Sequence, residues 1–280
     1  GGTTPLASLT VDNATTVTFG ADVTTTGTQD VTAGTVETNG THTVTTAGNI
    51  LFTGDLSLLA DTTLDTAAAN GDVTVTGATD GAFALTLDAG TGDVDLQGEV
   101  GGTTPLTSLT VNNASTATFG ADVTTTGTQD VTAGTVETSG THTVTTAGNI
   151  LFSGDLSLLA DTTLDTSAAN GDITVTGATD GGFSLTLDAG TGAIDLQGDA
   201  GGTTALANFA VLAAATADLA SVTADDINVV ASQINLNGTD YVANDGSVLF
   251  DGPVELFANV SVDSSANDGD ITFTDTVDGA

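Results

Sequence analysis

Residues 71–98 read GDVTVTGATDGAFALTLDAGTGDVDLQG, and this stretch decides the fold. Apolar residues alternate with Thr or Asp within it, and the alternating runs close on Gly77, Gly90 and Gly98. A period of two in Val, Leu and Thr is typical of half-buried β-strands that are bounded by turns. The stretch therefore predicts short strands joined by glycine turns.

The same pattern extends over the whole chain as a long repeat. Residues 1–100 and 101–200 align without a gap and differ at 14 of the 100 positions, while residues 201–280 form a divergent, truncated third copy. We interpret these as repeat units 1, 2 and 3 of one continuous solenoid. Because the third unit stops short of the full length, we expect the solenoid to continue in a longer chain.

A shorter period lies inside each hundred residues, at about 20 residues between equivalent glycine-closed runs. This period predicts an all-β, elongated parallel β-solenoid with five coils per hundred residues and roughly fourteen coils, a rod of about 67 Å at the usual strand spacing. Equivalent side chains are expected to stack inside it. Phe52, Phe152 and Phe250 share one sequence context, Phe83 and Phe183 a second, and Phe19 and Phe119 a third.

The charge of the chain is entirely acidic. There are 36 Asp and Glu residues and no Lys or Arg, which excludes phosphate-binding lysines, arginine clamps and nucleic-acid binding through basic contacts. Only four of the 36 acids are Glu, and Asp favours turns because it bonds nearby backbone amides. We expect a rod that gathers cations and needs salt or divalent ions to screen its repulsion.

A specific Ca²⁺ site is a separate prediction from this diffuse screening. Asp93 and Asp95 point to one face of a predicted strand, and Asp88 flanks the preceding glycine turn. Carboxylates and turn carbonyls are the ligands that Ca²⁺ prefers, so Asp88, Asp93 and Asp95 are the candidate ligands. Repeat unit 2 has Ala193 in place of Asp93.

The two histidines, His42 and His142, occupy one repeat position in identical THTVTT contexts. Zinc needs three or four ligands, and a catalytic base needs an orienting partner and a nucleophile. We therefore expect both histidines to be exposed strand residues without a metal or catalytic role. The chain also has no Cys and no apolar run near the ~18 residues of a membrane span.

The motifs GGTTPLASLTV, GDVTVTG and TLDAGTGDVDLQG resemble the strand repeats of very large bacterial surface proteins of the filamentous-haemagglutinin or autotransporter-adhesin type. The resemblance covers all 280 residues and is one of repeat style. It implies a right-handed parallel β-helix that is exported and serves adhesion or matrix functions.

These observations predict a non-enzymatic segment of an extracellular or cell-surface fibre, either an adhesin stalk or a matrix filament. Its expected partners are further coils or copies along the fibre axis, divalent cations, and a host or neighbouring-cell surface. Two alternatives stay open. One is a carbohydrate-active β-helix enzyme with its site in residues 211–245, and the other is a Thr-ladder module that binds ice or another surface. The uneven spacing of the Thr-x-Thr pairs argues against a ladder, which is expected to need coils of constant length.

Overall fold

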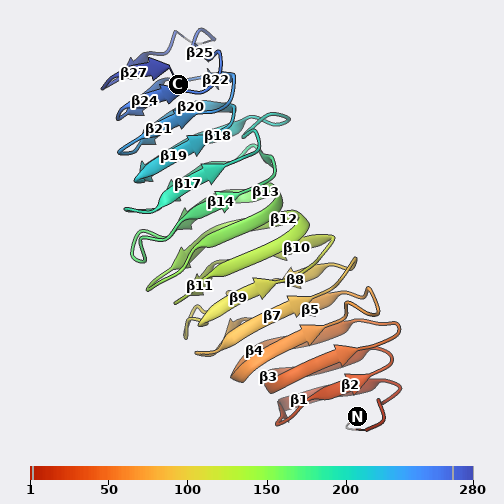
Figure 1. The fold of residues 1–280 in the computed structure, drawn as a ribbon. Coiled ribbons are helices and arrows are strands. Elements are labelled where there is room, and N and C mark those ends of the chain that lie inside the picture. The colour runs from red at the N-terminus through yellow and green to blue at the C-terminus, as the bar shows by residue number, and fades with distance from the viewer. Residues whose placement is uncertain (2, 267, 280) are drawn as a thin grey trace. The chain divides into compact units, whose positions relative to one another are not determined.

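The computed structural model describes residues 1, 3–266 and 268–279, and these contain β-strands and no helix. The strands form a parallel β-solenoid of about 13 turns, roughly 21 residues apart. The chain also divides into two compact units, unit 1 (residues 1–137) and unit 2 (residues 138–280), whose bounds differ from those of the repeat units. Figure 1 shows the strands of each unit following one another turn by turn.

Unit 1 contains eleven complete strands and the start of a twelfth, which ends in unit 2. They are β1 (Leu9–Phe19), β2 (Val23–Thr25), β3 (Gln29–Val44), β4 (Ile50–Asp65), β5 (Val73–Val75), β6 (Thr79–Asp80), β7 (Ala84–Asp88), β8 (Val94–Leu96), β9 (Ser108–Val111), β10 (Thr116–Phe119), β11 (Val123–Thr125) and β12 (Gln129–Val144).

Unit 2 continues with fifteen further strands among its described residues. They are β13 (Ile150–Asp165), β14 (Ile173–Val175), β15 (Thr179–Asp180), β16 (Leu185–Asp188), β17 (Ala193–Leu196), β18 (Leu206–Ala213), β19 (Thr216–Leu219), β20 (Val222–Val230), β21 (Ile234–Leu236), β22 (Asp240–Ala243), β23 (Val248–Asp251), β24 (Val254–Leu256), β25 (Ser261–Asp263), β26 (Ile271–Phe273) and β27 (Val277–Gly279).

Each turn of unit 1 has three sides, and each side pairs in parallel with the same side of the next turn. The pairings define three columns of inward-facing positions. Column A contains Leu9, Gln29, Ile50, Val73, Val94 and Ala117. Column B contains Val17, Val36, Leu56, Thr79, Val100 and Val123. Column C contains Val23, His42, Leu64, Leu87, Val111 and Val131.

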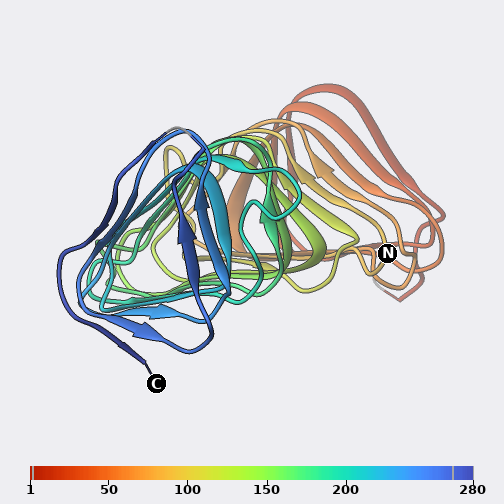
Figure 2. The same cartoon turned by 90° about the horizontal axis from the view of Figure 1, so that it is seen from above.

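The core is the interior that these columns enclose. In β5, Val73 and Val75 are buried while Thr74 between them is partly exposed, and the same alternation recurs in β8 and β11. Figure 2 shows the strands of successive turns running round this interior. The predicted alternation therefore places mainly aliphatic side chains inside, with buried threonines such as Thr79 and Thr125 among them, and hydroxyl or carboxylate side chains outside.

Two expectations about the core need correction. Phe52, Phe152 and Phe250 are buried, but they do not stack on one another. Within unit 2, Phe152 pairs with Val175 while Phe250 pairs with Val229 and Phe273, on a different side. Phe83 is only partly buried and Phe183 is 39% exposed, so that context does not point inward.

The hundred-residue repeat holds slightly fewer turns than the five predicted, because successive turns lie roughly 21 residues apart. In unit 1, Val23 lies in column C, whereas its repeat equivalent Val123 lies in column B. Counting sides along the chain from Val23 to Val123 gives 14, which is 14/3 or 4⅔ turns. The reason is that single turns differ in length, because the corners absorb extra residues: the turn from Val17 to Val36 is short, and the turn from Leu87 to Val111 is long.

Candidate functional site

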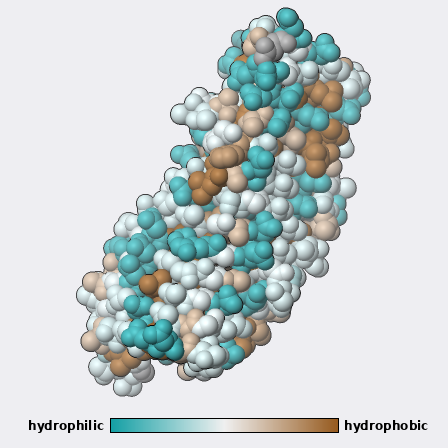
Figure 3. Space-filling view, turned by 180° about the vertical axis from the view of Figure 1, so that it is seen from behind, coloured by the Kyte–Doolittle hydropathy of each residue, from teal (hydrophilic) through white to brown (hydrophobic). Residues whose placement is uncertain are grey.

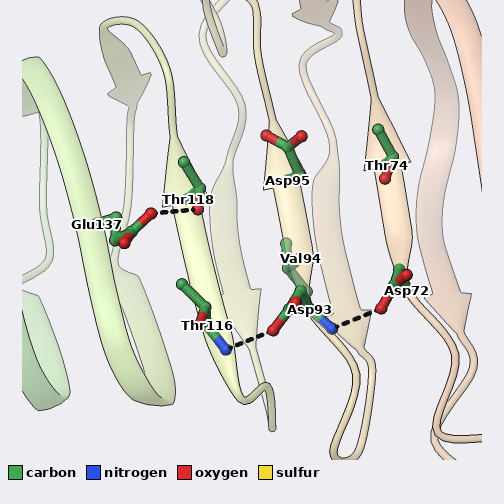
Figure 4. A pocket seen from close by; sticks show the side chains of 8 residues that line it. All are labelled: Asp72, Thr74, Asp93, Val94, Asp95, Thr116, Thr118 and Glu137. Atoms are coloured by element: carbon green, nitrogen blue, oxygen red, sulfur yellow. Dashed lines mark hydrogen bonds between the residues drawn. The ribbon is translucent and has the colours of Figure 1, made fainter. Parts of the chain in front are cut away.

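An acidic hollow on the outside of unit 1 is the candidate site that best matches the predicted residues. It lies over β5, β8, β10 and the start of β12 (Figure 4). The residues that line it are Asp72, Thr74, Asp93, Val94, Asp95, Thr116, Thr118 and Glu137. Four of these eight side chains are carboxylates on neighbouring turns, so the hollow concentrates negative charge.

The carboxylates of the hollow already accept hydrogen bonds from the protein. The Asp93 amide donates to Asp72 Oδ1 at 3.0 Å, and the Thr116 amide donates to Asp93 Oδ1 at 3.0 Å. The Thr118 hydroxyl donates to Glu137 Oε2 at 3.0 Å. These bonds orient Asp72, Asp93 and Glu137. Asp72 Oδ2 also accepts the Asn49 side-chain amide at 3.1 Å, and Asp95 Oδ2 accepts the Gln97 side-chain amide at 2.7 Å.

The structure brings two of the three predicted Ca²⁺ ligands together. Asp93 and Asp95 both line the hollow, as their shared strand face predicts. Asp88 ends β7 and accepts the Gly90 amide at 3.2 Å, outside the lining of the hollow. Among the described residues, no three His, Cys, Asp or Glu side chains form a group that could hold a metal ion. Binding of Ca²⁺ by Asp88, Asp93 and Asp95 stays a prediction.

A second use of aspartate was not predicted from the sequence. In many corners, Asp Oδ1 accepts a backbone amide that lies about one turn further along the chain. In unit 1 these bonds run to Asp22 from Thr41, to Asp55 from Ala78, to Asp61 from Ala84, to Asp72 from Asp93, to Asp80 from Thr103 and Thr104, and to Asp93 from Thr116.

These inter-turn bonds explain why the acids are Asp. A corner amide that donates to the preceding turn finds there a short Asp side chain, whose carboxylate is a strong acceptor. The signal in the sequence was the excess of Asp over Glu. This excess fits Asp side chains that accept backbone amides within their own turn, and it fits equally well those that accept amides of the next turn. Asn49 and Asn70 serve in the same way, accepting the Asp72 and Thr91 amides.

The histidines are buried, so the expectation of exposed strand residues is wrong. His42 lies in column C with no exposed surface, between the rings of Phe19 and Phe52 at centroid distances of 5.0 and 5.3 Å. Its Nδ1 lies 2.9 Å from Gln29 Oε1, and its Nε2 lies 2.7 Å from the Thr38 hydroxyl. His142 is buried in the same way, and its Nε2 lies 2.7 Å from the Thr138 hydroxyl.

This network defines the protonation state of His42. The Gln29 oxygen can only accept, so Nδ1 carries the proton and Nε2 accepts from the Thr38 hydroxyl. Burial lowers the pKa of His42 to about 4, against a smaller upward effect of Asp22, and burial lowers the pKa of His142 to about 3. Both imidazoles are therefore neutral core residues that cannot reach a substrate.

An outward column of threonines runs beside column C in unit 1. Thr41 pairs with Thr63, Thr63 with Thr86, and Thr86 with Thr110, although the three turns between them differ in length. The next rung is Asp130. The Thr-x-Thr pairs that begin at Thr16, Thr41 and Thr74 lie on three different sides and form no ladder, as their spacing predicts. The expectation that a ladder needs turns of constant length does not hold for this column, because the corners take up the difference in turn length.

The divergent third repeat places its tyrosine inside the solenoid. Tyr241 is fully buried, and its hydroxyl donates to the Leu219 carbonyl at 2.7 Å and accepts the Gly238 amide at 3.3 Å. Burial raises the pKa of this hydroxyl. The Tyr241 ring is consequently a core residue and offers no surface on which a sugar could stack.

The outer surface between these features is largely polar. Figure 3 shows one face of the molecule, on which apolar residues form small, separate patches among hydrophilic ones. Exposed large apolar side chains are scattered and include Leu59, Leu159 and Leu212. None of the described residues lies in a helix that is long and apolar enough to cross a membrane.

The fold and these surfaces define the class of the protein as a parallel β-solenoid with an acidic exterior. Comparison of the chain with protein-family models, with curated proteins and with solved structures gives no match.

Proposed function

We propose that the chain is a non-catalytic structural segment of an extracellular or cell-surface fibre, either an adhesin stalk or a matrix filament. The observation that carries the proposal is the combination of parallel turns with nearly identical hundred-residue units. Each turn of a solenoid contacts only its neighbours, so added units extend the structure without redesign of the core. A chain that duplicates whole units is suited to setting length.

The acidic surface has a place in this proposal. The chain carries 36 carboxylates over about 13 turns, nearly three per turn, with no Lys or Arg to neutralise them. Repulsion between such charges keeps neighbouring fibres apart unless cations screen or bridge them. The hollow of Asp72, Asp93, Asp95 and Glu137 is where we propose that divalent cations gather most strongly.

The location of the protein rests on its resemblance to bacterial surface repeats. Gold-labelled antibodies raised against residues 1–280 test it directly on intact and sectioned cells. We expect gold along extracellular fibres if the segment is a scaffold or stalk, with label spread over the length of each fibre. Label confined to the cell interior would overturn the proposal, and label at fibre tips alone would favour a terminal adhesin domain.

A second candidate function has one specific observation in its favour. The threonine column Thr41, Thr63, Thr86 and Thr110 is a regular array of hydroxyls at the strand spacing, as binding to ice or another ordered surface requires. Partition of the purified protein into a growing ice front tests it. We expect exclusion from ice if the role is structural, whereas uptake that is lost in Thr63→Asp/Thr86→Asp would establish the alternative.

A further inference from the structure

Equivalent residues of the first two repeat units lie on different sides of unit 1. Val17 is in column B and Ala117 in column A, while Val23 is in column C and Val123 in column B. Val31 pairs with Phe52 on side A, whereas Val131 ends column C. Every pair shows the same displacement of one side backward, which is an advance of 14 sides.

The interior explains why one sequence can occupy any side. Each side contributes one or two buried positions to the core, and most are filled by the apolar residues Val, Ile, Leu or Phe. Val23 packs beside His42, and Val123 packs beside Val100, yet both continue parallel pairing with the turns around them. The three sides are therefore equivalent enough to exchange their segments, since volume and polarity pattern matter more than a particular contact.

The same displacement limits every surface feature that the repeat carries. The threonine column runs through Thr41, Thr63, Thr86 and Thr110, which all belong to the first hundred residues and the start of the second. Its next rung is Asp130 of repeat unit 2. The equivalent residue of repeat unit 1, Asp30, lies on side A. The threonine column thus ends after four rungs, because repeat unit 2 places a different part of its sequence on the side of column C.

We infer that the hundred-residue unit is a screw element: each added unit extends the solenoid by 14 sides and turns its surface features by two thirds of a turn about the axis. A feature carried by every unit faces three directions in succession and returns to the first side after three units. The contact surface that the repeats generate is therefore distributed around the solenoid. A partner that binds a repeated surface feature can therefore bind on three sides of the solenoid. A neighbouring identical chain, bridged by divalent cations, is such a partner.

The rotation does not depend on the proposed fibre role, although the neighbouring-chain partner does. Imaging of a lengthened protein tests the rotation. Three further copies of residues 101–200 are inserted after residue 200 of the full chain, and single molecules are reconstructed by electron cryo-microscopy. We expect successive copies to be related by a rotation near 240° in one sense, modified by the solenoid's own twist, and by a rise of about 22 Å. A pure translation without rotation, by a whole number of strand spacings, would overturn the inference.

A measurement on the unlengthened chain covers the case in which the insertion misfolds. The distance between two spin labels is measured in two double variants. Thr24→Cys/Thr124→Cys labels equivalent positions of repeat units 1 and 2, and Thr41→Cys/Asp130→Cys labels two positions on the same side, four strand spacings apart. We expect about 19 Å between the backbones of the same-side pair, and clearly more than five strand spacings, about 24 Å, for the equivalent pair. An equivalent pair separated by five strand spacings or fewer contradicts the rotation, whatever the location of the protein in the cell.

Discussion

At the residue scale, the aspartates act first as acceptors for the backbone and only then as surface charge. Asp61 is exposed, and its Oδ1 accepts the Ala84 amide of the next turn at 3.0 Å. Asp161 repeats the contact with the Ser184 amide at 2.9 Å. At these corners the carboxylate serves as a short acceptor for the backbone, and its negative charge accompanies that role.

Substitutions at Asp61 test this role. Asp61→Ala removes the acceptor and should lower the free energy of unfolding by about 1 kcal/mol, as loss of a charge-assisted hydrogen bond does. Asp61→Asn keeps an oxygen in place and should be nearly neutral, or slightly stabilising at low salt. Urea unfolding of both variants measures the difference. Equal destabilisation by Ala and Asn would show that charge, and not the hydrogen bond, matters at this corner.

The buried histidines make stability depend on pH. The pKa of His42 in the folded chain is about 4, below its ordinary value of 6.5, so the unfolded chain binds more protons between these values. Stability is therefore complete above pH 6.5 and falls as the pH drops toward 4, by up to about 3 kcal/mol for His42. The urea midpoint should fall over this range.

A matched variant separates the histidines from the carboxylates, which titrate in both proteins. In His42→Gln/His142→Gln no imidazole is present, so the decline of the urea midpoint between pH 6.5 and 4.5 should be much shallower than in the parent chain. Parallel pH profiles in the two proteins would contradict the role assigned to the buried imidazoles.

At the scale of elements, close approach of successive corners requires glycine at particular places. A Cβ on Gly71 would collide with the Gly48 carbonyl oxygen, and a Cβ on Gly92 with the Gly71 carbonyl oxygen. The three glycines form a column along which backbone lies on backbone. Gly77 and Gly98, which close alternating runs in the sequence, form a second such column with Gly54.

Alanine substitution distinguishes this column from an open corner. Gly71→Ala should destabilise the protein by roughly 2 kcal/mol or more, because the backbone of the previous turn must move. Gly20→Ala is the control, since nothing lies within 4 Å of a Cβ built there. Thermal melting of the two variants should show a clear loss for Gly71→Ala and little change for Gly20→Ala; similar melting temperatures would refute the packing argument.

Much of the fold could be predicted from single strands, and much of the candidate site could not. Alternation around Val73 and Val75 gives the strand and its buried face correctly. The burial of His42 was not predictable, because its partners Gln29 and Thr38 lie in the same long strand, β3, and meet it only where that strand bends round the interior. Asp93 and Asp95 were paired correctly from one strand, whereas the contributions of Asp72 and Glu137 depend on the register between turns.

At the scale of the molecule, the absence of Lys and Arg makes the solenoid depend on its medium. With 36 acids and no Lys or Arg, repulsion is screened only by ions from outside. Removal of divalent ions with EDTA at low ionic strength should lower the melting temperature by roughly 5 °C or more, corresponding to a few kcal/mol. Restoring NaCl should recover it, and an unchanged melting temperature would rule out this dependence.

The spacing of the turns along a native fibre tests the account most directly. In a solenoid, neighbouring turns are hydrogen-bonded along the axis, so oriented fibres isolated from the native source should give a meridional reflection at about 4.8 Å. Image analysis of the same fibres should show an axial rise of about 22 Å per hundred-residue unit, which is 4⅔ turns. A strand spacing perpendicular to the fibre axis, or an absence of fibres that contain the protein, would contradict the account.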